Sequence, residues 1–161
     1  MKTMTEQLGI YLRDHRAGAA AGSDLARRAA DENDGTPYGH FLSGLADEIE
    51  ADVMTLEQIM SRFDVTPDLL KNAGAKVGEK LGRLKPNGQL TGYSPLSRVL
   101  EMEGLRAGVQ GKLSLWQSLR EVAPAHPELD EAELDELVAS AEGQLDGLRK
   151  QHGLAAREAF A

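Results

Sequence analysis

Apolar residues recur at helical spacing along four long segments of the chain. The clearest run lies within residues 37–63, where apolar side chains follow one another at steps of three and four: Leu42, Leu45, Ile49, Val53, Leu56, Met60 and Phe63. This period places them on one face of an α-helix. Similar stripes occur within residues 3–31, 95–122 and 130–159. The pattern predicts four long amphipathic helices that share one apolar interior.

Turn-forming and capping residues lie between these segments. Thr36-Pro37 and Ser94-Pro95 each offer a hydroxyl N-cap followed by proline at the first helical position. The last segment begins with acidic residues and ends with basic ones, which is the polarity that the helix dipole favours. Residues 64–94 form a long connection, in which Thr66-Pro67 predicts the start of a shorter helix over about 67–84.

Length and composition agree with this organisation. A chain of 161 residues, rich in alanine, leucine and glutamate and with only 4% aromatic residues, fits one helical domain. We therefore expect residues 1–161 to form a single all-α domain, an antiparallel four-helix bundle with one extra short helix in the connection.

Charge and residue usage narrow the classes of function. The net charge of -8 disfavours binding to nucleic-acid phosphates. The chain has no cysteine, which excludes disulfides and thiolate chemistry and suits a reducing cytoplasm. No apolar run reaches the roughly 18 residues of a membrane span, and the first residues gain charge before any signal-peptide core develops. We expect a soluble cytoplasmic protein.

The order of elements, two helices followed by a long crossover and two more helices, resembles the ferritin-like bundles. In that family two helices carry Glu-x-x-His pairs and the other two each supply a glutamate to a di-iron or di-manganese centre. This sequence contains no Glu-x-x-His and no Asp-x-x-His. The resemblance thus implies a diverged member whose standard dimetal centre is lost or rebuilt.

Candidate metal ligands remain on the inner stripes. His15 is surrounded by apolar or small positions, Glu48 and Asp52 share one side of their helix, and Glu142 lies in the last helix. If a metal binds, we expect iron or manganese at these four residues. The alternative for His15, and for His152 in the last stripe, is an imidazole at the core edge hydrogen-bonded to a carbonyl or carboxylate.

Helix order decides which of these residues meet. If the four helices alternate in direction, residue counting puts His15 and Asp52 at the height of Arg106 and His152. If the long connection runs the length of the bundle, they share a level with Lys112 and Glu142 instead, and His152 is distant. We favour the second arrangement because the connection is long and partly helical.

Small residues form two further faces, Gly18 with Gly22 and Gly104 with Gly108 and Gly111, where another helix could approach closely. No phosphate-binding loop or nucleophile motif is present, so we expect no enzymatic activity. The favoured function is a structural or interaction module that associates with itself or with a protein partner. The alternatives are a diverged ferritin-like metalloprotein with a redox or storage role, and a small-molecule carrier with a pocket near Trp116 and Tyr93.

Overall fold

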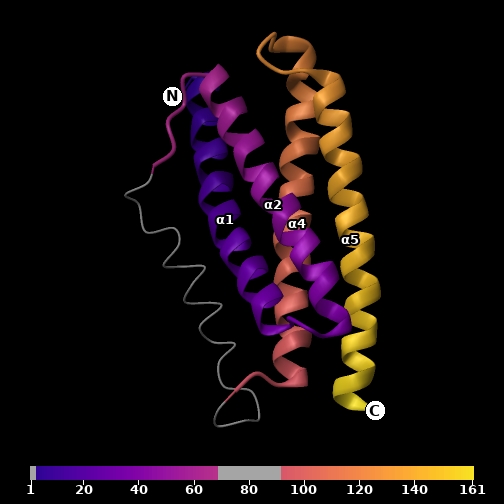
Figure 1. Cartoon of the computed structure of the whole chain (residues 1–161). Coiled ribbons are helices and arrows are strands. Elements are labelled where there is room, and N and C mark those ends of the chain that lie inside the picture. The colour runs from indigo at the N-terminus through magenta and orange to yellow at the C-terminus, as the bar shows by residue number, and fades with distance from the viewer. Residues whose placement is uncertain (1–2, 69–91) are drawn as a thin grey trace.

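The computed structural model describes residues 3–68 and 92–161, and these form four long helices (Figure 1). Helix α1 spans Met4–Glu32, α2 Pro37–Arg62, α4 Pro95–Val122 and α5 Glu131–Phe160, with a short 3-10 turn at Ala123–Ala125. The described ranges contain no strand, and the expected all-α class is confirmed. The short helix expected at 67–84 falls almost wholly outside them. None of the described helices is long and apolar enough to cross a membrane.

Local capping explains where the helices begin. Thr36 accepts a hydrogen bond from the Tyr38 amide, and Pro37 occupies the first turn, as expected. Ser94 caps α4 in the same way and exchanges hydrogen bonds with Ser97. Asp130 accepts from two free amides at the start of α5. Each cap satisfies backbone donors that the first turn leaves unpaired.

Two helical hairpins make up the bundle, α1 with α2 and α4 with α5, and α1 also contacts α4. Side-chain pairs give the directions. Arg16 meets Glu57 and Arg27 meets Asp47, so α1 and α2 run in opposite directions. Tyr11 meets Ser118 near one end of α1, and Arg28 meets Glu101 near the other, so α4 also runs opposite to α1. Helices α2 and α4 therefore point the same way (Figure 1).

The core lies along the shared axis. Its largest fully buried side chains come from all four helices: Leu12, Leu42, Leu56, Ile59, Met60, Met102, Leu105, Leu115, Trp116, Leu119, Leu134 and Leu148. Burying a side chain of this kind contributes about 1.5–3 kcal/mol relative to leaving it in water. The predicted apolar stripes therefore supply the core.

Two glycines allow unusually close packing. A Cβ atom on Gly39 would lie 2.4 Å from the carbonyl oxygen of Asn33, in the turn between α1 and α2. A Cβ atom on Gly147 would lie 2.6 Å from Cε2 of Phe41, which α2 presses onto α5. Glycine at these positions sets how closely the elements approach.

A polar network closes the end of the bundle where α1 stops and α4 starts. Asn33 is fully buried, and its side-chain amide donates to the Ala29 carbonyl and to the Tyr93 hydroxyl, both at 2.8 Å. Its side-chain oxygen accepts from Arg98 Nε at 2.6 Å. Tyr93 in turn donates to Glu101 Oε2 at 2.8 Å. Burial raises the pKa values of both Tyr93 and Glu101.

We expect Gly39→Ala to destabilise the protein by about 1–3 kcal/mol, because the added methyl group collides with backbone rather than with a movable side chain. Gly44→Ala is the matched control in the same helix, where a Cβ meets nothing within 4 Å. It should stabilise by up to about 1 kcal/mol through helix propensity. Urea unfolding followed by circular dichroism measures both. Equal effects of the two substitutions would contradict the packing at Gly39.

Candidate functional site

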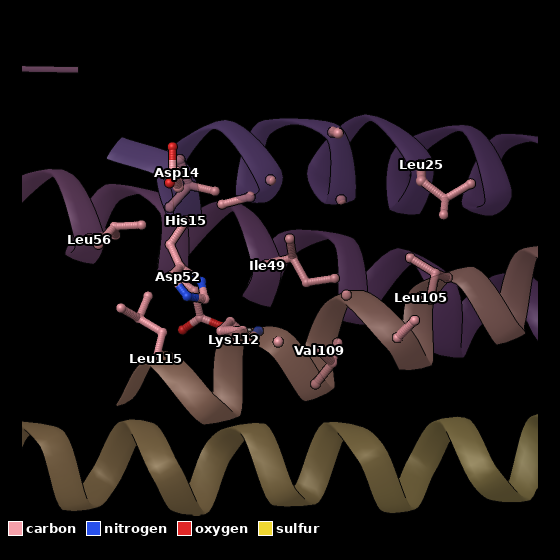
Figure 2. A pocket seen from close by; sticks show the side chains of 18 of the residues that line it. Asp14, His15, Leu25, Ile49, Asp52, Leu56, Leu105, Val109, Lys112 and Leu115 are labelled. Carbon is pink, nitrogen blue, oxygen red and sulfur yellow. Dashed lines mark hydrogen bonds and ion pairs between the residues drawn. The ribbon is translucent and has the colours of Figure 1, made fainter. Parts of the chain in front are cut away.

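An apolar groove with a volume of about 640 Å³ runs between α1 and α4 (Figure 2). Helix α2 forms its floor through Ile49, Asp52, Val53 and Leu56. Most of the lining is apolar, and only a few ionisable side chains reach it. A concave apolar site of this size with a few polar groups is typical of small-molecule binding sites.

Glycines and alanines line both walls of the groove. Gly18 and Gly22 come from α1, and Gly108 and Gly111 from α4. A Cβ atom at any of these four positions would meet no heavy atom within 4 Å. The sequence suggested that another helix approaches these faces closely, but no helix in the described ranges does so. The missing side chains instead leave space open between the two walls.

The polar side chains gather at one end of the groove. Figure 2 shows Asp14, His15, Asp52 and Lys112 there, beside Leu56 and Leu115, whereas Leu25 and Leu105 lie at the opposite end. On α1, His15 and Leu25 are ten residue steps apart, which corresponds to about 15 Å at a rise of about 1.5 Å per residue. The groove is therefore long, and its ionisable side chains mark one end, called the polar end.

A largely buried ion pair, Lys112 with Asp52, lies at this polar end. The two side chains are 14% and 12% exposed, so each charge depends on the other for compensation. Lys112 Nζ also donates to Gln144 Oε1 at 2.5 Å. Gln144 Nε2 donates to Glu48 Oε2 at 3.0 Å and lies 3.3 Å from Asp52 Oδ2. The pair thus joins α2 and α4, and Gln144 extends it to α5.

His15 is half-buried beside this pair, and the Tyr11 ring packs edge-on against it with 4.5 Å between ring centroids. Burial lowers the pKa of His15 below its ordinary value, with a smaller opposing effect from the Asp14 carboxylate. A pKa below 6.5 leaves the imidazole predominantly neutral at pH 7. Within the described residues, neither ring nitrogen has a hydrogen-bond partner.

The four candidate metal ligands do not converge as a set. His15 and Asp52 line the groove, and Glu48 reaches Asp52 only through Gln144. Glu142 is exposed on α5, two residues before the inward-facing Gln144. Across residues 3–68 and 92–161, no three His, Cys, Asp or Glu side chains form a group that could hold a metal ion. A metal site at these residues stays a prediction.

The other flagged residues divide between the groove and the surface. His152 Nε2 lies 3.1 Å from Glu103 Oε1, and its Nδ1 lies 3.4 Å from Arg106 Nη1. His152 thus has the carboxylate partner that was expected for an imidazole at the edge of the core. Asp52 meets Lys112, as residue counting predicts when the second and third long helices are parallel. Tyr93 belongs to the Asn33 network rather than to a pocket with Trp116.

Trp116 is the single tryptophan of the chain and is 1% exposed beneath the groove wall. Its Nε1 atom is buried and has no hydrogen-bond partner among the described residues. An unpaired buried donor of this kind costs about 1–3 kcal/mol. Apolar packing therefore has to hold the ring in place.

Gln144 was not identified from the sequence. For Lys112 the sequence predicted only the height along the bundle, the same as that of His15 and Asp52. A signal was present for both. Gln144 lies three residues after Ala141 and four before Leu148, and Lys112 has the same spacing between Val109 and Trp116. Polar residues on an otherwise apolar stripe are expected to find partners inside the bundle.

We expect Asp52→Ala to lower the free energy of unfolding by about 3 kcal/mol or more, because Lys112 keeps its charge in the interior without a carboxylate. The double variant Asp52→Leu with Lys112→Met should lose less, since it leaves no unpaired charge. Asp47→Ala breaks the exposed pair with Arg27 and serves as the control, which should change the unfolding free energy far less. Chemical denaturation of the four proteins compares them. A double variant that is less stable than Asp52→Ala would refute this account of the pair.

The lowered pKa of His15 predicts a pH dependence of stability. As the pH falls below the ordinary value of 6.5, the unfolded chain takes up the proton before the folded protein does, so the unfolding free energy decreases until the folded pKa is passed. His15→Gln should remove this contribution and flatten the loss of stability as the pH falls below 6.5. His40→Gln, at an exposed site, should retain it. Denaturation curves at several pH values provide the test, and an unchanged slope in His15→Gln would contradict the burial of the imidazole.

The sequence matches no model of a known protein family, and searches of curated proteins and of solved structures give no significant match. These comparisons therefore assign the chain to no family.

Proposed function

We propose that this protein is a non-enzymatic binding protein whose groove holds an elongated small molecule. The observation that carries the proposal is the apolar groove of about 640 Å³, open along glycine-lined walls and polar at one end. Its size lies within the range of known ligand pockets, about 300–1,000 Å³. An amphipathic molecule would match it, with an apolar tail toward Leu25 and Leu105 and a polar head near His15.

The helix arrangement that we propose is ferritin-like. The support is that α2 and α4 point the same way although they are consecutive long helices, which requires a crossover between them. The metal chemistry of that family receives less support. Only His15 and Asp52 of the four candidate ligands line the groove, and Asp52 is already engaged by Lys112. We therefore favour binding over a redox or storage role with iron or manganese.

A second occupant of the groove competes with a small molecule, namely a helix from another copy of this chain. The favouring observation is that Gly18, Ala107 and Gly108 are exposed along the groove, where a helix backbone could approach. Sedimentation of the purified protein distinguishes the two. A dimer that dissociates when bulky side chains fill the groove would favour self-association, and a monomer would favour the small molecule.

The test of binding uses N-phenyl-1-naphthylamine, an uncharged probe that fluoresces in apolar surroundings. We expect saturable binding that also changes the emission of Trp116 beneath the groove. Gly22→Leu and Gly108→Leu should each weaken it at least tenfold, because both positions line the groove, a Cβ atom at either meets no heavy atom within 4 Å, and the added side chain takes up groove space.

The matched control is Gly143→Leu, at an exposed position on α5 that is equally free of neighbours. It should bind the probe like the unaltered protein. Absence of saturable binding, or equal loss in all three variants, would overturn the proposed function.

A further inference from the structure

We propose that the groove selects amphiphiles with an uncharged hydroxyl or amide head, which hydrogen-bonds to His15, and rejects those with a carboxylate head. This inference rests on the proposed function and names the ligand class of the same groove. It follows from the free hydrogen-bonding groups and the charges at the polar end.

Among the described side chains at this end, His15 is the one with both a free donor and a free acceptor. Its ring lines the groove, and among the described residues neither nitrogen is hydrogen-bonded. A neutral imidazole carries one N–H donor and one acceptor nitrogen. A hydroxyl or an amide can pair with either of them, whereas a carboxylate can only accept.

Among the residues that the structure describes, Lys112 is the one lysine or arginine that lines the groove, and it is not available to an anion. Lys112 is paired with Asp52 and hydrogen-bonded to Gln144, and the same carboxylate also accepts from Gln144. A carboxylate head would lose its hydration at this end, and the described lining offers no unpaired cation to replace it.

A cationic head is disfavoured for a related reason. Of the two carboxylates at this end, Asp52 is occupied by Lys112, and Asp14 is exposed to water, where its attraction is screened. The ammonium group of Lys112 would repel a second cation in the groove. The inner charges at this end thus cancel each other, and an uncharged head incurs the smallest desolvation cost.

The experiment compares three ligands with one tail, namely 1-decanol, decanoate and decylammonium, each displacing N-phenyl-1-naphthylamine at neutral pH. We expect decanol to compete at least tenfold more strongly than either ion. His15→Phe keeps an aromatic ring but removes both hydrogen-bonding atoms, and it should reduce decanol affinity about tenfold. His40→Phe, at an exposed position, is the control and should leave the affinity unchanged.

A gain of function provides a second arm. Asp52→Asn keeps an acceptor for Lys112 but removes the compensating charge, so decanoate should bind at least tenfold better than it does to the unaltered protein. Circular dichroism verifies that each variant is folded.

Failure of this inference can be told apart from failure of the proposed function. If the probe itself does not bind, the groove is not a small-molecule site. If the probe binds but the three decyl compounds compete equally, or decanoate competes best against the unaltered protein, only the selectivity inferred here is wrong.

Discussion

The ion pair of Asp52 with Lys112 joins the two hairpins of the bundle across its interior. Asp52 belongs to the α1–α2 hairpin and Lys112 to the α4–α5 hairpin, and Gln144 adds hydrogen bonds to both. A shift of one helical turn, about 5.4 Å, would separate the charges and leave each without compensation. The pair therefore fixes the register between the hairpins. It also neutralises Lys112, the one lysine among the described residues that lines the groove.

The groove itself follows from the distribution of small residues between two fixed ends. At one end, Tyr11 of α1 is hydrogen-bonded to Ser118 of α4. At the other end, Asn33, the residue that follows α1, is hydrogen-bonded to Arg98 of α4. Between these contacts the facing positions are largely glycine and alanine, which have no side chains long enough to meet across the gap. Because α1 and α4 are linked at both ends and carry mostly short side chains in between, a continuous groove remains between them.

The four long helices could be predicted from the sequence because the features that determine them are local. Proline at the first turn, a hydroxyl cap and a three-to-four spacing act within a few residues, and the caps at Thr36 and Ser94 were recognised from them. The meeting of Asp52 with Lys112 could be anticipated by counting residues once a helix order was assumed.

The rest depended on packing that no local pattern encodes. Glycine permits a close approach but does not cause one, so the predicted contact at Gly18 and Gly22 is an open wall. In the polar network at the end of the bundle, Asn33 bonds to Tyr93 and Arg98, which lie 60 and 65 positions further along the chain. The contact between Gly147 and Phe41 is also of this kind: α5 lacks a side chain where α2 places a ring, and together the two positions set the spacing of these helices. Among related chains, a larger residue at 147 would therefore be tolerated chiefly where position 41 has become smaller, so the two positions should vary together.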